Sequence, residues 1–245
     1  MRILALALIV CAPLIAQNRT ILAIGAHAGD MELTAGAVLA HQAKKGDRIV
    51  LLHLSPGEAG HPTLSPQEYG DQKRREGAAA AKALGAEVIF APFTDGLVRR
   101  TDTTVRYVAE MIRTVKPQVV ITHWKNSMHP DHSETHVLVK EAVLLAALRT
   151  FDSKLRIHRG VRLYYADNWE DAEGFQPYLF IDVSADVDTW KDAVGKYAFV
   201  TASSFAYMNY YEGLFRTRGA LAGKKFAEAF DIDPESKKRV ADALP

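Results

Sequence analysis

The feature that most constrains the fold is the alternation of short apolar runs with amphipathic segments along most of the chain. The apolar runs predict strands over residues 20–26, 48–54, 87–91, 118–122, 161–165 and 178–183. The segments between and after them predict helices over residues 30–45, 65–84, 103–115, 131–148 and 186–197. Strands that alternate with helices form βαβ units, which build a mostly parallel sheet covered by helices on both faces. We therefore predict a three-layer α/β fold, in one domain that spans residues 17–245.

The amino terminus is typical of a targeting segment. Met1 and Arg2 precede an apolar run from Ile3 to Ala16. A basic start, a short apolar stretch and a small residue at its end indicate a secretory signal peptide, which we place at residues 1–16. The run is shorter than the roughly 20 residues that a membrane-spanning helix needs. We expect a secreted or periplasmic protein without a stable membrane span; the alternative is that this run forms a first strand.

The composition excludes several classes of protein. The 245 residues contain 30 basic and 29 acidic side chains, a formal net charge of +1. Nucleic-acid binding usually shows as a basic imbalance, so we expect no nucleic-acid partner. The one cysteine of the chain, Cys11, excludes a disulfide framework and a cysteine-based zinc site.

Residues that bind metals gather in the loops after the first and fourth predicted strands. His27 and Asp30 follow the first strand, and His129, Asp131 and His132 follow the fourth. Ligands of open α/β sheets sit at the carboxyl ends of the strands, and histidine nitrogen and carboxylate oxygen are zinc ligands. A single histidine here could equally cap a helix or lie in solvent. The joint pattern predicts a catalytic metal site, although ligand type leaves other divalent metals open.

Several motifs resemble those of the PIG-L and LmbE-like de-N-acetylases. The stretch from His27 to Glu32 (HAGDME) is similar to the first motif of that family, and His129-Pro130-Asp131-His132 matches the second. Weaker similarities follow in the same order along the chain. They are residues 55–60, 73–85, 94–96, 218–219 and 228–230. The resemblance implies a Rossmann-like three-layer sandwich.

The resemblance also implies an activity and roles for individual residues. Members of the family are zinc hydrolases that remove acetyl groups from N-acetylglucosamine-type small molecules or glycoconjugates. Their metal ligands correspond to His27, Asp30 and His132. His129 would then stabilise the oxyanion or protonate the leaving amine, and Asp131 would orient or charge its imidazole.

One position departs from the family pattern. The residue that corresponds to the general base of the family, an aspartate, is Gly29, and general-base assistance contributes roughly 10²–10⁴-fold in rate. Three interpretations stay open. The base could be relocated, to Asp131 acting with His129 or to Glu58; the substrate or a partner could complete the site; or the chain could be a non-catalytic member that still binds metal or carbohydrate.

Four side chains are candidates for substrate binding. Lys73 stands where the family usually has an arginine that contacts substrate, and Arg74 follows it. Glu58 lies in the Gly-Glu loop after the second strand. Trp124 adjoins the second motif, where it could stack on a sugar ring or pack in the core. The aromatic run at residues 205–211 could likewise form a wall of the cleft or pack against the domain.

Overall fold

The structure is a computed structural model that describes residues 18–150, 152–167 and 173–237. The predicted signal peptide lies outside the described residues, so it stays a prediction. Within the described residues, no helix combines the length and the apolar character that a bilayer span requires.

A seven-stranded sheet forms the centre of the molecule, in the order β3-β2-β1-β4-β5-β7-β6. Its strands are β1 (Thr20–His27), β2 (Arg48–Ser55), β3 (Ala86–Phe90), β4 (Val119–His123), β5 (Arg162–Ala166), β6 (Leu179–Asp182) and β7 (Ala227–Asp231). The first five strands pair in parallel, whereas β7 is antiparallel to both β5 and β6. The chain order reverses direction at β1, since β2 and β4 lie on its two sides. Such a switch point is where ligands bind in open α/β sheets.

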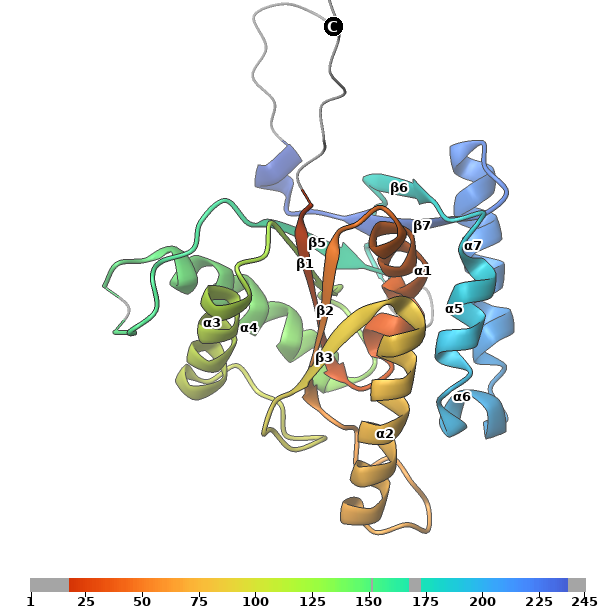
Figure 1. The fold of residues 1–245 in the computed structure, drawn as a ribbon, viewed down its shortest axis with the longest axis horizontal. Helices are drawn as coiled ribbons and strands as arrows, with labels where there is room; N and C mark the ends of the chain where they lie inside the picture. The colour runs from red at the N-terminus through yellow and green to blue at the C-terminus, as the bar shows by residue number, and fades with distance from the viewer. Residues whose placement is uncertain (1–17, 151, 168–172, 238–245) are drawn as a thin grey trace, which may run out of the picture.

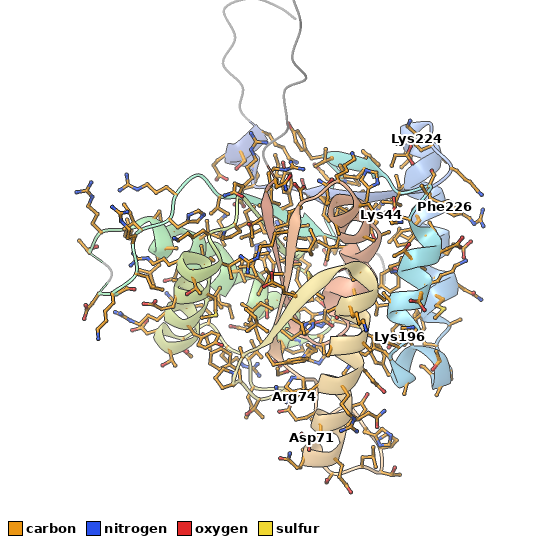
Figure 2. All side chains as sticks on the ribbon, viewed as in Figure 1. Lys44, Asp71, Arg74, Lys196, Lys224 and Phe226 are labelled. Atoms are coloured by element: carbon orange, nitrogen blue, oxygen red, sulfur yellow. The ribbon has the colours of Figure 1, made fainter. Side chains whose placement is uncertain are left out.

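Helices cover both faces of the sheet (Figure 1). On one face lie α3 (Asp102–Val115) and α4 (Pro130–Ala147). On the other lie α1 (Asp30–Lys44), α2 (Pro66–Leu84), α5 (Val187–Val194), α6 (Ala198–Ala202) and α7 (Tyr207–Ala222), and a short 3-10 helix (Pro234–Lys237) follows β7. Each face has its own buried apolar cluster, and side chains fill the space between the layers (Figure 2). The predicted three-layer α/β fold is confirmed.

Local signals explain why the helices begin where they do. Ser65 caps α2 through a reciprocal pair of hydrogen bonds with Glu68, and Gly85 ends the helix with a positive φ of 72°. These are the residues that favour such positions. The cap of α4 is His129, whose side chain accepts a hydrogen bond from the backbone N–H of Asp131. The second motif is therefore also the start of a helix.

The carboxyl-terminal third differs most from the sequence prediction. The predicted strands and helices up to residue 194 all form, with ends displaced by a few residues. Helices α6 and α7 and strand β7 were not predicted. Strand β7 enters the sheet between β5 and β6, so β5 and β6 are not direct neighbours although they are consecutive strands. A short segment such as Ala227–Asp231 becomes a strand because it finds two partners, which local sequence does not reveal.

A buried carboxylate joins β7 to α1. Glu228 Oε2 accepts a hydrogen bond from Val38 N at 2.7 Å, and Oε1 accepts one from Ala37 N at 3.1 Å. Burial raises the pKa of Glu228 to about 8. A group whose pKa is raised on folding stabilises the folded state fully below its unfolded pKa, and this contribution is lost as pH rises through the folded pKa.

We expect the unfolding free energy to fall by about 1 kcal/mol per pH unit between pH 5 and pH 8 because of Glu228. Denaturant titrations at each pH will measure it. The Glu228→Gln variant should lack this component of the slope, and Glu87→Gln, which changes an exposed carboxylate, should keep it. Equal slopes for the wild type and Glu228→Gln would contradict the assignment.

Candidate metal centre and cleft

The loops after β1 and β4 meet at the carboxyl edge of the sheet. His27 is the last residue of β1, and α1 begins at Asp30. The backbone N–H of His27 donates to Asp30 Oδ2 over 2.7 Å, which folds this carboxylate back over the end of the strand. Because β1 and β4 are parallel neighbours, His132 in the first turn of α4 reaches the same place.

The three predicted metal ligands present one atom each to a common point. His27 Nδ1 lies 3.3 Å from His132 Nε2 and 3.3 Å from Asp30 Oδ2, and His132 Nε2 lies 3.4 Å from the same oxygen. Tetrahedral zinc with bonds of about 2.0–2.1 Å separates its ligand atoms by about 3.3–3.4 Å. The donor set and its spacing therefore fit a zinc ion. Their role as ligands stays a prediction, but the structure brings the three residues together.

Other ionisable groups surround this triangle. His129 groups with His27 and His132, and His123 groups with Asp30 and His132, each set having its donor atoms within 4.8 Å. Burial alone would raise the pKa of Asp30, but the facing imidazoles of His132 and His27 lower it well below the ordinary value. Burial alone would lower the pKa of His27, but the nearby carboxylates, Asp30 foremost, raise it well above the ordinary value. A metal ion would replace the proton that these groups share.

Polar groups lie at the outer ring nitrogens of both predicted histidine ligands. The other ring nitrogen of His27, Nε2, lies 3.0 Å from Asp95 Oδ1 and 3.4 Å from Asp131 Oδ2. The other ring nitrogen of His132, Nδ1, lies 3.3 Å from Ser127 Oγ. An acceptor on the far nitrogen of a ligating imidazole fixes its tautomer and its orientation. The hydrogen bond with Ser127 can orient His132 in this way, whereas the Nε2 atom of His27 lies near two carboxylates without an aligned hydrogen bond.

His129 lies beside the triangle with one nitrogen already used. Its Nδ1 accepts the backbone N–H of Asp131 at 3.3 Å, so the ring proton is on Nε2 when the imidazole is neutral. Burial lowers the pKa of His129, and His27 and His132 lower it further. This arrangement favours a neutral imidazole that donates from Nε2.

The Asp131 carboxylate forms its hydrogen bonds with groups other than His129, and its predicted role toward His129 stays a prediction. Asp131 Oδ1 accepts from Arg99 at 2.7 Å, and Oδ2 accepts from the backbone N–H of Gly96 at 2.8 Å. These hydrogen bonds, together with the contact to His27, occupy the carboxylate. Asp131 therefore supports His27 and the turn that follows β3. It orients His129 through its backbone N–H, and its negative charge acts to raise the pKa of that imidazole.

His123, at the end of β4, also supports the site. Its Nε2 accepts the backbone N–H of Ala26 at 3.0 Å and lies 3.2 Å from Asp30 Oδ2. Its ring stacks on that of His132, with centroids 4.1 Å apart. Burial lowers the pKa of His123 to about 4. The neutral ring of His123 contacts both Asp30 and His132, so it helps to fix the positions of these two predicted ligands.

A cleft of about 550 Å³ opens beside the triangle, and a smaller lobe of about 230 Å³ lies on its other side. His27, Asp30, His129, Phe199 and Tyr207 line both spaces. The larger one also contains polar side chains from the β2–α2 loop, from α2 and from the β3–α3 loop. They are His61, Tyr69, Gln72, Lys73 and Asp95.

Phe199 occupies the space beside Gly29. A Cβ atom placed on Gly29 would lie 2.8 Å from Phe199 Cζ, and the φ of Gly29 is +107°. Both the backbone and the neighbouring ring therefore require glycine. The aromatic ring of Phe199, from α6, thus occupies the space that a side chain at residue 29 would need.

We expect Gly29→Asp to lower the unfolding free energy by about 2–4 kcal/mol, because it combines backbone strain with overpacking. Gly223→Asp is a matched control: its φ is +67° and nothing lies within 4 Å of the added Cβ. The double variant Gly29→Asp/Phe199→Ala should recover part of the loss. Thermal unfolding will measure all three, and equal losses at Gly29 and Gly223 would contradict the contact with Phe199.

Lys73, which was predicted to bind substrate, lies at the floor of the cleft. Its Nζ donates to the carbonyl of Ala28 at 2.6 Å. The ammonium lies 3.9 Å from the ring centroid of Phe199 and 4.7 Å from that of Tyr197. Burial lowers the pKa of Lys73 to about 8.

The other three predicted substrate-binding residues do not line the cleft. Glu58 Oε1 accepts the backbone N–H of Asp95 at 3.0 Å, so it holds the turn after β3. Arg74 on α2 is not among the residues that line either space, and its guanidinium lies 5.1 Å from the Phe90 ring centroid. Trp124 is buried, and its Nε1 donates to the carbonyl of Glu173 at 2.8 Å. It therefore packs in the core rather than stacking on a ligand.

Sequence reasoning missed four residues that shape the site. They are His123, Asp95, Arg99 and Phe199. The position of His123 at a strand end, and of Asp95 in a family-like turn, were signals that could have found them. Neither Arg99 nor Phe199 belongs to a recognisable motif, and only the packing of the loops reveals them. The relocated bases considered above, Asp131 and Glu58, are both engaged elsewhere.

Comparisons with known proteins identify relatives of two kinds. The chain is 26% identical over 177 residues, 69% of each protein, to a 4-oxalmesaconate hydratase of Pseudomonas putida. It is 31% identical over 157 residues to a 1D-myo-inositol 2-acetamido-2-deoxy-alpha-D-glucopyranoside deacetylase of Acidothermus cellulolyticus, a match over 51% of this chain and 53% of that one. The chain thus spans about half the length of that deacetylase.

A solved structure shows the same fold. The 4-carboxy-2-hydroxymuconate hydratase GalB of Pseudomonas putida superposes with a TM-score of 0.81 at 24% identity, over 93% of this chain and 100% of that one. The family described as PIG-L, GlcNAc-PI de-N-acetylase, matches residues 22–143, which include both metal-site loops. With the motifs, the sheet and these matches together, the chain belongs to the PIG-L family of de-N-acetylases and related enzymes.

Proposed function

We propose that this protein is a metal-dependent amide hydrolase that removes an acetyl group from an N-acetylated sugar or glycoconjugate. The observation that carries the proposal is the triangle of His27 Nδ1, Asp30 Oδ2 and His132 Nε2 at the floor of a cleft. When bound, a zinc ion would polarise the substrate carbonyl and lower the pKa of a water molecule.

The chain's own residues provide the rest of the chemistry. His129 lines the cleft, and Nε2–H is the donor of its neutral ring, because Nδ1 accepts the backbone N–H of Asp131. A donor placed there stabilises the negative charge that develops on a carbonyl oxygen. Asp95 lines the cleft and contacts His27, so it fixes the orientation of the metal site from the substrate side.

The test is acetate release from the zinc-loaded protein with a panel of N-acetylglucosamine compounds. Acetate and free amine should appear in equal amounts, and chelation should abolish both. A protein that retains zinc but releases no acetate from any compound would contradict the proposal, and it would favour the alternative of a non-catalytic metal- or carbohydrate-binding member of the family.

A second candidate is addition of water to a carbon–carbon double bond. Two observations favour it: the hydratase of Pseudomonas putida matches over 69% of both proteins, and Gly29 leaves the site without the carboxylate that the family uses for amide hydrolysis. Loss of ultraviolet absorbance from a conjugated unsaturated acid, without release of any fragment, would identify this reaction.

A further inference from the structure

The ammonium of Lys73 is a buried positive charge without a direct ion pair among the described residues. Carboxylates act on it only from a greater distance, namely those of Asp30, Glu32, Glu76 and Asp95. The residue is 4% exposed. Among the described residues, its contacts are the carbonyl of Ala28 and the faces of two aromatic rings. A buried charge is costly unless a charge of opposite sign and further hydrogen bonds compensate it. The carbonyl of Ala28 and the two rings stabilise the ammonium only in part. Among the described residues they leave N–H groups of Lys73 without a hydrogen-bond acceptor.

Gly29 is the reason that the partner is missing. A Cβ atom on residue 29 would lie 3.8 Å from Lys73 Nζ, so a carboxylate at this position would pair with the ammonium directly. Here the side chain is absent, and Phe199 fills the space with a ring that carries no charge.

The charged residues that line the cleft also leave Lys73 without a direct ion pair. Among the described residues that line it, Asp30 and Asp95 carry negative charges and Lys73 carries a positive one. A divalent ion at the metal position would balance the two carboxylates. The charge of Lys73 is then compensated only from a distance, by Glu32 and Glu76, and among the described residues no carboxylate contacts the ammonium directly before a ligand binds.

We propose that the substrate of this cleft carries a carboxylate, which pairs with the Lys73 ammonium next to the metal position. This inference rests on the proposed function in taking the cleft as the substrate site. It changes the expected substrate class from neutral N-acetylated sugars to acids, such as a sugar that bears both an acetamido group and a carboxylate. The carboxylate supplies the negative charge that residue 29 lacks.

Calorimetric titration of the zinc-loaded protein tests the proposal with two matched pairs of ligands. The first is N-acetylglucosamine and its uronic acid, in which a carboxylate replaces the C6 hydroxymethyl group. The second is succinamide and succinate. A charge-assisted hydrogen bond to a buried ammonium should make the acid of at least one pair bind about tenfold more tightly, or better. If neither acid is preferred, the proposal is wrong.

Variants separate Lys73 from the metal as the source of any preference. Lys73→Met and Lys73→Gln, two neutral replacements, should reduce the preference for the acid to about threefold or less. Lys82→Met changes an exposed lysine on the same helix and should keep the full preference. A preference that survives in both Lys73 variants, with zinc content unchanged, would assign it to the metal alone and overturn the proposal.

The outcome is independent of hydrolysis. Tighter binding of the acids without acetate release would leave the carboxylate site standing while the proposed deacetylation fails. Acetate release from neutral N-acetylglucosamine, with no preference for either acid, would support the deacetylation and overturn the carboxylate site.

Discussion

Replacement of Asp30 by asparagine should remove the metal and reduce turnover by about 10³-fold or more, since metal polarisation contributes several kcal/mol to the transition state. Asp30 Oδ2 is the negatively charged corner of the ligand triangle and lies within 3.4 Å of three imidazole rings. Asparagine keeps the shape of the side chain but loses the charge, so a divalent ion is no longer balanced.

Zinc content after purification and acetate release from the N-acetylglucosamine panel will measure this effect together. The Asp188→Asn variant, which alters an exposed aspartate on α5, should behave as the wild type in both assays. If Asp30→Asn retains a full equivalent of zinc and its activity, the triangle is not the metal site.

Replacement of His129 by alanine should reduce turnover by about 10²–10³-fold while the metal is retained. The structure is consistent with a donor role for His129, because this residue lines the cleft and its Nδ1 accepts the backbone N–H of Asp131, which leaves Nε2–H as the ring donor. The expected signature is therefore a loss of rate at constant zinc content, which distinguishes it from the loss expected for Asp30→Asn.

A second cleft histidine provides the control. His61 also lines the cleft, but its Nδ1 accepts the backbone N–H groups of Thr63 and Leu64, and it lies outside the predicted metal sets. His61→Ala should change turnover little. Loss of zinc from His129→Ala would show instead that His129 is a ligand, since it also groups with His27 and His132.

The sequence predicted the fold well where local patterns are strong. Strands β1, β2 and β4 are almost wholly buried, and they consist mostly of apolar residues. Helices α2 and α3 begin at capping boxes, so these elements are specified largely by their own residues. Prediction weakened after residue 194. There α7 and β7 are defined by the surfaces they pack against, and β7 separates two strands that are consecutive in the chain.

In the site, too, residues in short motifs could be predicted, whereas contacts between distant segments of the chain could not. His27, Asp30 and His132 could be chosen from sequence because short motifs at adjacent strand ends must converge at one edge of a parallel sheet. The sequence could not show how Asp131 contacts His129, which it does through its backbone N–H rather than its carboxylate. In the folded chain Arg99, from another loop, takes the Asp131 carboxylate.

The sequence by itself determined a three-layer α/β fold, two loops that carry the residue types of a metal site, and the absence of the family's carboxylate at residue 29. Only the tertiary structure decided what that absence means. Contacts between residues far apart in the chain place Phe199 in the vacant space and Lys73 beside it, and no local pattern encodes them. The physical consequence is electrostatic: the buried ammonium of Lys73 has no carboxylate at residue 29 to pair with directly, and other carboxylates act on it only from a greater distance.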